Sequence, residues 1–258
     1  SDLTRMTTQA QAIGQDGSQD AVAAYLDGAA LIKIAKEMHC DCIHPGYGFL
    51  SENANFATMC AAEDIAFIGP SASALQLFGD KVTARALAQS CGIPVVAGST
   101  AALNSSSEAR EIAHGIGYPV MLKAAAGGGG RGMRAVASDD ELADAFERCQ
   151  SEAAAAFGDG SIFIEKLVLR PRHIEVQILA DTKGQTVHLH ERDCSVQIRN
   201  QKVIEIAPAA GLDPTLRQNM HDDAIKLAKA ADYVNAGTVE FLVSPESGDY
   251  YFIECNPR

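Results

Sequence analysis

Four consecutive glycines, Gly127 to Gly130, constrain the fold of this chain more than any other feature of its sequence. Ordering glycine costs more backbone entropy than ordering any other residue, and glycine has no side chain to pack in return. Such a run does allow backbone N–H groups to approach an anion closely, and that anion is most often a phosphate. The run lies between two segments typical of strands, 118–124 and 133–136. We therefore expect an anion-binding loop between two strands, with a flexible hairpin loop that binds nothing as the alternative.

The residues around the glycines exclude two common phosphate-binding motifs. A P-loop needs Lys-Ser or Lys-Thr directly after its last glycine, whereas Gly132 is followed by Met133. A dinucleotide-binding fingerprint needs a helix after the glycines, whereas the pattern here predicts a strand. Lys123 ends the preceding strand and favours a phosphate ligand, because a lysine there can reach the phosphate as a point charge.

Hydrophobic periodicity predicts alternating helices and strands along the rest of the chain. The first part has the βαβα order that is typical of a parallel sheet covered by helices. The segments 173–181 and 185–193 alternate like paired antiparallel strands. We therefore predict an α/β fold with an α+β portion. The expected helices are 29–38, 53–63, 80–90, 107–116, 139–156 and 214–231, and the other expected strands are a short buried one within 40–49, then 65–70, 161–168, 237–244 and 249–255.

Two glutamates stand in apolar strands near the end of the chain. Glu240 lies in GTVEFL and Glu254 in YFIECN, where an unpaired buried carboxylate would be costly. On adjacent antiparallel strands the two carboxylates would face each other and repel unless a cation lay between them. Mg²⁺ accepts such oxygen ligands and binds ATP phosphates, and Asn256 shares the face of Glu254. The alternative is a pair of solvent-facing charges on a half-exposed sheet.

Charge and cysteine usage narrow the class of protein. The formal net charge of −12 argues against a nucleic-acid-binding protein but leaves room for a nucleotide site with a few local cations. The seven cysteines are odd in number and contain no C-x-x-C pair. We therefore expect reduced thiols in an intracellular protein and no cysteine-built zinc site. No apolar run is long enough to cross a bilayer, and the first residues do not form a secretory signal.

The motifs taken together resemble one family. The segment 190–208 is dense in polar and cationic residues and completes a set of eight collinear motifs. They resemble the biotin carboxylase component of biotin-dependent carboxylases from about Ala23 to the end, and the last two look most like the pyruvate carboxylase branch. The motifs are HPGYGFLSEN, FGDK, LKAAAGGGGRGM, EKLVLRPRHIEVQIL, HERDCSVQ, QKVIEIAPA, NAGTVEFL and YFIECNPR.

The resemblance implies an ATP-grasp fold preceded by a partial Rossmann-like N-terminal subdomain. By this likeness residues 1–80 form that subdomain and residues 81–258 the ATP-grasp domain. The latter would contain a lid at about 95–167 and an incomplete central sheet at 168–258.

The same resemblance implies the ATP-dependent carboxylation of biotin by bicarbonate, through carboxyphosphate. The cofactors implied are ATP, Mg²⁺ or Mn²⁺, and biotin on a carrier domain. The full-length protein is expected to be a homo-oligomer in the cytoplasm or the mitochondrial matrix. By match, Lys202 and Arg258 bind bicarbonate as the catalytic residues, and Lys166 and Val168 read adenine through their backbone groups. The metal ligands implied are Glu240, Glu254 and Asn256, and the residues implied for the nucleotide are Lys81, Lys123, Gly129, Gly130, Glu165, Lys166, Val168, His173, Gln197 and Asn200.

The sequence departs from the family at two positions beside the implied nucleotide site. Asn200 stands where the family usually has histidine, and Ile198 stands where it usually has arginine. The family continues after Arg258 with a Gln-Val-Glu-His run that holds the expected general base. We therefore expect a chain that is cut at both ends and inactive by itself. The alternatives are the biotin carboxylase of an acetyl-, propionyl- or methylcrotonyl-CoA carboxylase, an inactive ATP-binding remnant and, more distantly, carbamoyl-phosphate synthase.

Overall fold

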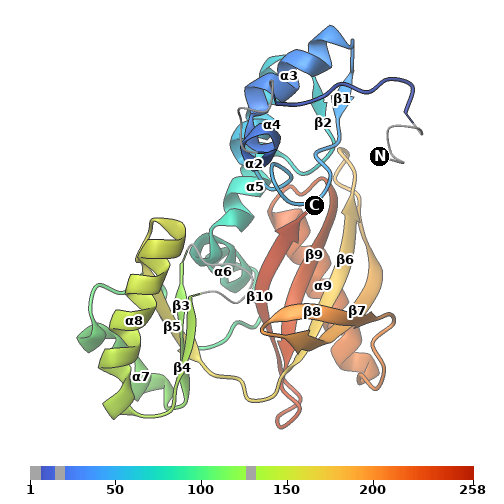
Figure 1. The fold of residues 1–258 in the computed structure, drawn as a ribbon. Helices are drawn as coiled ribbons and strands as arrows, with labels where there is room; N and C mark the ends of the chain where they lie inside the picture. The colour runs from blue at the N-terminus through green and yellow to red at the C-terminus, as the bar shows by residue number, and fades with distance from the viewer. Residues whose placement is uncertain (1–6, 15–20, 126–131) are drawn as a thin grey trace. The chain divides into compact units, whose positions relative to one another are not determined.

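The computed structural model of this chain describes residues 7–14, 21–125 and 132–258 (Figure 1). These residues form two compact units, and the boundary between the units falls inside helix α5, Ala72–Gly79. The first unit is Ser1–Gln76 with Pro257–Arg258, and the second is Leu77–Asn256. Among the helices in the described ranges, none is both long and apolar enough to span a membrane.

The first unit has the βαβα order that the sequence predicts. Strands β1 (Cys42–Ile43) and β2 (Ala66–Phe67) pair in parallel. Helices α3 (Gly28–Glu37) and α4 (Ala54–Ala62) enclose a small core that includes Ile32, Phe56 and Cys60. The prediction that the first strand is buried is wrong, because Cys42 is exposed and Ile43 is only half-buried. Helix α2, Ala21–Leu26, and helix α5 were not predicted from the sequence.

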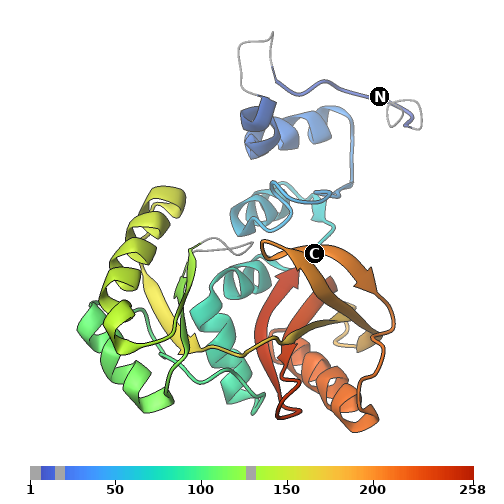
Figure 2. The same cartoon turned by 60° about the horizontal axis from the view of Figure 1, so that its bottom comes forward.

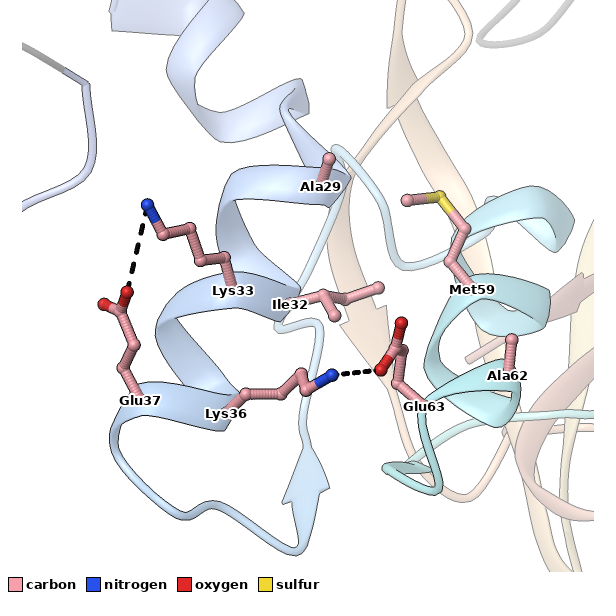
Figure 3. Close-up of a pocket in the computed structure, with 8 residues that line it drawn as sticks. All are labelled: Ala29, Ile32, Lys33, Lys36, Glu37, Met59, Ala62 and Glu63. Atoms are coloured by element: carbon pink, nitrogen blue, oxygen red, sulfur yellow. Dashed lines mark hydrogen bonds and ion pairs between the residues drawn. The ribbon is translucent and has the colours of Figure 1, made fainter.

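A groove of about 450 Å³ lies between α3 and α4 (Figure 3). Its floor includes Ile32 and Met59, and the ion pair between Lys36 and Glu63 joins its two walls. None of the residues that the sequence predicts for a nucleotide or metal lines this groove.

The second unit contains a three-stranded antiparallel sheet in the order β4-β3-β5. Two helices cover one face of this sheet and share its core (Figure 1). Three acidic residues in the first turn of α8 suit the positive end of the helix dipole. The elements are α7 (Ser106–Ile116), β3 (Val120–Ala124), β4 (Met133–Val136), α8 (Asp139–Phe157) and β5 (Ile162–Lys166).

This small sheet with its two helices lies within the range 95–167 that was predicted for a lid. The structure therefore confirms the expected elements of that subdomain. The glycine loop predicted for its tip, including Gly129 and Gly130, lies outside the described residues. The closing movement of a lid stays a prediction.

The second unit also contains a five-stranded sheet in the order β10-β9-β6-β7-β8, with helix α9 against one face (Figure 2). Its hairpin between β7 and β8 turns at Arg199 and Asn200, whose φ angles are 52° and 62°. The expected strand 185–193 was too short, because β7 continues to this turn. The elements are β6 (Arg172–Ala180), β7 (Thr186–Ile198), β8 (Gln201–Ile206), α9 (Pro214–Ala230), β9 (Asn235–Val243) and β10 (Tyr250–Pro257).

The segment before α7 runs along the free edge of β5. Ser99 N–H donates to the Ile164 carbonyl at 2.8 Å, and Lys166 N–H donates to the Ala97 carbonyl at 2.7 Å. Gly98 lies opposite Glu165 in this pairing. A Cβ atom at Gly98 would run into the Ile164 carbonyl oxygen and approach Glu165 Cα to 2.9 Å. The edge can therefore be covered in this way only if position 98 has no side chain.

Replacing Gly98 by alanine should destabilise the second unit, by about 1–3 kcal/mol as other overpacked sites do. The measurement is the free energy of unfolding in urea. Gly115→Ala is the matched control, because a Cβ at this helical position meets nothing within 4 Å. That control should stabilise α7 by about 0.5–1 kcal/mol. Equal effects of the two substitutions would contradict the steric argument.

Candidate functional site

The carboxylate of Glu240, on β9, is completely buried and is held by donors from three other strands. Lys202 Nζ, from β8, lies 2.7 Å from Oε1 of Glu240. His173 Nε2, from β6, lies 2.5 Å from Oε2, and the side-chain amide of Asn256, from β10, donates to Oε1. The large sheet therefore gathers a carboxylate, an ammonium, an imidazole and an amide on one face.

Glu175 on β6 is the second buried carboxylate of this group, with 3% of its surface exposed. It lies directly opposite Glu240 in the pairing of β6 with β9. Two like charges directly opposite each other destabilise a sheet. Lys202 relieves this repulsion because its ammonium also contacts Glu175, so a single cation bridges the two carboxylates.

Arg192 on β7 provides a second cation for Glu175. Arg192 Nε donates to Glu175 Oε1 at 2.6 Å, and the guanidinium also donates to Gln177 Oε1 at 3.1 Å. Sequence reasoning missed both Glu175 and Arg192. The alternation of HIEVQ could have revealed Glu175, because residues 173, 175 and 177 of a strand share one face.

These contacts fix the charge states of the group. Burial by itself would raise the pKa of Glu240, but His173 and Lys202 outweigh burial and lower this pKa to about 2. Burial by itself would lower the pKa of Lys202, but the Glu240 and Glu175 carboxylates raise it above its ordinary value. Both side chains are therefore charged at neutral pH.

Glu254 and Asn256 lie on β10, next to β9 in the sheet. The short connection from Ser244 to Asp249 makes the two strands antiparallel, because a parallel pair needs a crossover. Asn256 contacts Glu240, and Glu254 shares its face because the two residues are two apart. The predicted strand arrangement is therefore confirmed. Lys81 Nζ, at the first residue of α6 (Lys81–Ser90), lies 3.6 Å from Glu254 Oε2.

The side chains of Glu240, Glu254 and Asn256 fit a hard divalent cation such as Mg²⁺. Each carries an oxygen donor, and Mg²⁺ prefers oxygen ligands. The Asn256 amide presents its nitrogen to Glu240 here, and a 180° flip of the amide would present its oxygen instead. That these residues bind a metal stays a prediction.

A second buried charge group lies on the small sheet. Glu165, on β5, is 8% exposed, and its Oε2 lies 2.5 Å from Lys123 Nζ on β3. Its Oε1 accepts from Arg85 Nη1, on α6, at 3.0 Å. Arg85 also donates to the Val96 carbonyl. Sequence reasoning missed Arg85, because an arginine within a helix more often lies on the surface.

Lys166 and Val168 differ in the backbone groups that they leave available. The Lys166 N–H is used by the Ala97 carbonyl, and its ammonium donates to the carbonyls of Gly117 and Tyr118 at 3.0 and 2.8 Å. Val168 follows the end of β5. In the part of the chain that the structure describes, its backbone groups have no hydrogen-bond partner.

His173 and Gln197 both belong to the Glu240 group. Gln197 Nε2 lies 2.9 Å from His173 Nδ1, so His173 links Gln197 to Glu240. Asn200 occupies the second position of the β7–β8 turn, where its left-handed backbone is one that asparagine tolerates well. Ile198 ends β7 and is 64% exposed.

Arg258 belongs to the first unit, whereas the other predicted site residues that the structure describes belong to the second. There its guanidinium lies 3.5 Å from Glu52 and 5.6 Å from the centre of the Tyr47 ring. The predicted pairing of Arg258 with Lys202 around bicarbonate stays a prediction.

Comparison with protein families gives two matches along the chain. Residues 80–258 match the carbamoyl-phosphate synthase L chain, ATP binding domain, and residues 1–75 match the biotin carboxylase, N-terminal domain. The sequence is 52% identical to pyruvate carboxylase of Schizosaccharomyces pombe over 95% of this chain and 21% of that protein. It is 55% identical to human mitochondrial pyruvate carboxylase, over 92% of this chain and 20% of that protein. It is 50% identical to biotin carboxylase of a Nostoc species, over 98% of this chain and 56% of that protein.

Solved structures give the same relationship. The biotin carboxylase–βγ-ATP complex of Campylobacter jejuni has a TM-score of 0.90 at 50% identity, over 95% of this chain and 54% of that chain. The biotin carboxylase domain dimer of Hydrogenobacter thermophilus 2-oxoglutarate carboxylase, solved with MgADP, ADP and bicarbonate, has a TM-score of 0.92 at 43% identity, over 99% of this chain and 55% of that chain. The chain thus spans about a fifth of the pyruvate carboxylases and about half of the biotin carboxylases that it matches.

Replacing Glu240 by glutamine should lower the free energy of unfolding at pH 7 by roughly 3 kcal/mol, because a buried charge group loses one member. The pKa of Glu240 falls on folding from 4.5 to about 2. Its charge therefore stabilises the fold fully above pH 4.5, and this stabilisation decreases as the pH falls toward 2.

The measurement is urea unfolding of the wild type and of Glu240→Gln at pH 7 and at several pH values below 4.5. The difference between their free energies of unfolding should shrink as the pH falls. Glu246→Gln is the matched control, because Glu246 is an exposed carboxylate that lies 3.3 Å from Arg170. A difference between wild type and Glu240→Gln that does not change with pH would contradict the assignment.

Proposed function

Because this chain belongs to the biotin carboxylase family and has its ATP-grasp fold, we propose that it supplies the nucleotide-binding part of an enzyme that carboxylates biotin with bicarbonate, as part of a pyruvate carboxylase. The observation that carries the proposal is the buried group Glu175, Lys202 and Glu240, with Glu254 and Asn256 on the neighbouring strand. Fixed charges of this kind suit phosphoryl transfer, in which positioning and electrostatics supply most of the catalysis.

We place the phosphates of ATP near Lys81 and Lys123. Each of these lysines now faces a carboxylate, Glu254 or Glu165 respectively, so each is held in place before an anion arrives. Gly129 and Gly130 would close over the phosphates. Mg²⁺ or Mn²⁺, held by Glu240, Glu254 and Asn256, would neutralise part of the phosphate charge.

We assign adenine recognition chiefly to the backbone of Val168. The Lys166 N–H is already used by Ala97, so at Lys166 only the carbonyl remains for the base. The side chain of Lys166 is bound to the carbonyls that end α7, and it would act by fixing the strand end. His173 and Gln197 would contact the ribose and phosphates, with Asn200 in the turn beside them.

We propose that Lys202 binds bicarbonate as a permanent cation. Its raised pKa keeps the ammonium protonated at neutral pH, so it acts by charge and not as a base. When a bicarbonate oxygen attacks the γ-phosphorus, the bond from that phosphorus to the β-phosphate oxygen breaks, ADP leaves, and a fixed cation stabilises the negative charge on the transferring group. Arg258 would be the second cation. The resulting carboxyphosphate would then carboxylate the ureido nitrogen of biotin, with release of phosphate and of the proton on that nitrogen.

The proposed partners are biotin on a carrier domain and further copies of the full-length protein. The Hydrogenobacter thermophilus relative is described as a domain dimer, which supports an oligomer. All seven cysteines are free in the structure, which supports an intracellular protein of the cytoplasm or the mitochondrial matrix.

Nucleotide binding can be tested with a fluorescent ATP analogue titrated into the chain, with and without Mg²⁺. We expect weak, Mg²⁺-dependent binding. Lys123→Gln and Glu254→Gln should each weaken it by about tenfold, which corresponds to about 1.4 kcal/mol. Lys183→Gln is the matched control, because it removes one exposed positive charge in the β6–β7 turn. Equal binding by all four proteins would refute the assigned site.

Turnover can be tested by ATP hydrolysis that depends on both bicarbonate and biotin. The chain should be inactive alone, whereas a longer chain that includes the family's remaining residues should be active. If the longer chain is inactive but still binds MgATP, the protein is better described as an ATP-binding remnant. Ile198 and Asn200, where the family usually has arginine and histidine, are the observation that favours this alternative.

A further inference from the structure

Three histidines meet where helix α9 crosses the back of strand β7. The His188 and His221 rings are stacked, with their centres 4.0 Å apart. The His190 ring lies 5.4 Å from the His188 ring and 5.8 Å from the His221 ring. One potential ligand atom from each residue lies within 4.8 Å of the others. We call these three residues the histidine cluster.

A β-bulge places the cluster. Val176 pairs with Glu191 and Ile178 pairs with His188, so two residues of β7, Leu189 and His190, lie opposite a single residue of β6. His190 has the left-handed φ of 65° that the bulge requires. The bulge turns His188 and Glu191 to the same face, although residues three apart in a regular strand lie on opposite faces. Both then reach His221.

The surroundings of His221 are those of a metal ligand. His221 is buried, and its Nε2 lies 2.7 Å from Glu191 Oε2. Glu191 is fixed in turn by Arg217 Nε at 3.0 Å and by the Ala209 N–H at 3.1 Å. Metal-ligating histidines commonly donate their other ring N–H to such a carboxylate, which sets the tautomer. If Nε2–H is the donor to Glu191, Nδ1 of His221 is the nitrogen that is left for a metal.

The other two histidines are accessible in different degrees. His190 is exposed and His188 is half-buried, so an ion has a route from solvent. The imidazole of His188 would bind the ion in its neutral form. Its Nδ1 now accepts a long hydrogen bond of 3.3 Å from the His190 N–H, which a metal at that nitrogen would replace.

We propose that His188, His190 and His221 bind a transition-metal dication, with Zn²⁺ as the best fit, on the face of the sheet opposite the Glu240 group. Zn²⁺ takes imidazole nitrogens at about 2.0–2.1 Å in tetrahedral geometry. The stacked His188 and His221 rings must turn, and the three nitrogens must come closer together, to reach that geometry, and water would fill the fourth position. The ion would join β7 to α9.

A competing cluster, Glu175, Cys194 and Glu205, is a poorer zinc site. Burial raises the pKa of Cys194 to about 12, so forming the thiolate that zinc binds costs more free energy there than at an exposed cysteine. Glu175 is already engaged by Lys202 and Arg192. Glu205 lies 3.6 Å from Arg192.

The test is calorimetric titration of ZnCl₂ into the purified chain at pH 7.5, with any affinity tag removed. We expect one site in the wild type. The main variant is His190→Ala, because His190 is exposed and its loss should not affect folding. This variant should weaken Zn²⁺ binding by about tenfold or more. His188→Ala/His190→Ala should abolish binding. His114→Ala is the matched control, because this exposed histidine lies on α7 beside Asp139, and it should bind Zn²⁺ like the wild type.

Two further measurements locate the ion. Zn²⁺ should raise the thermal unfolding midpoint of the wild type and of Cys194→Ser, but not that of His188→Ala/His190→Ala. Co²⁺ in place of Zn²⁺ should give the visible absorption of a four-coordinate site, and His188→Ala/His190→Ala should lose this absorption. No Zn²⁺ binding by the folded wild type would overturn the proposal, and so would equal binding by the wild type and His188→Ala/His190→Ala. Loss of binding in Cys194→Ser alone would move the site to the competing cluster.

Discussion

The ammonium of Lys202 bridges two buried carboxylates, and the pairing of the strands that carry them depends on this compensation of charge. Glu175 and Glu240 are directly opposite each other on the central strands β6 and β9. Without a cation between them, the register that buries Ile174, Val176 and Phe241 would also bury two repelling charges. The apolar core on one face and the charge group on the other are therefore parts of the same strand pairing.

Each lysine that was predicted to bind an anion is paired with a carboxylate. Lys202 faces Glu240, Lys123 faces Glu165, and Lys81 lies near Glu254. A carboxylate fixes each ammonium and restricts its rotamers before a ligand arrives. A preorganised cation stabilises developing negative charge without the cost of reorganising the site. An anion that binds at one of these lysines would have to compete with the carboxylate, and a divalent cation on the carboxylate side would favour the exchange.

The two faces of the large sheet have different chemistry because strand residues alternate between them. One face carries the Glu240 group, with Glu175 and Arg192 in register. The other face lies against α9, and there the bulge at His190 brings Glu191 onto the apolar side, where His221 and Arg217 hold its charge. The bulge thus gives the back of the sheet a second polar centre.

The sequence by itself determined which segments form most of the helices and strands, because hydrophobic periodicity is a local property. It also determined that Glu254 and Asn256 share a face, since that follows from the two-residue repeat of a strand. It did not reveal α2 or α5, which are short, or the full length of β7, whose end depends on a two-residue turn. The family motifs supplied the predicted site residues, several of which the fold brings together around Glu240.

Only the tertiary structure decided which charges meet. Glu175 lies opposite Glu240 because β6 lies between β7 and β9, an order that does not follow the chain. Arg85 reaches Glu165 from a helix far away in sequence, and His221 reaches His188 from α9. The physical reason is that local patterns fix the direction of a side chain relative to its own element. The partner that it meets depends on strand order, register and bulges, and these are set by packing over the whole unit.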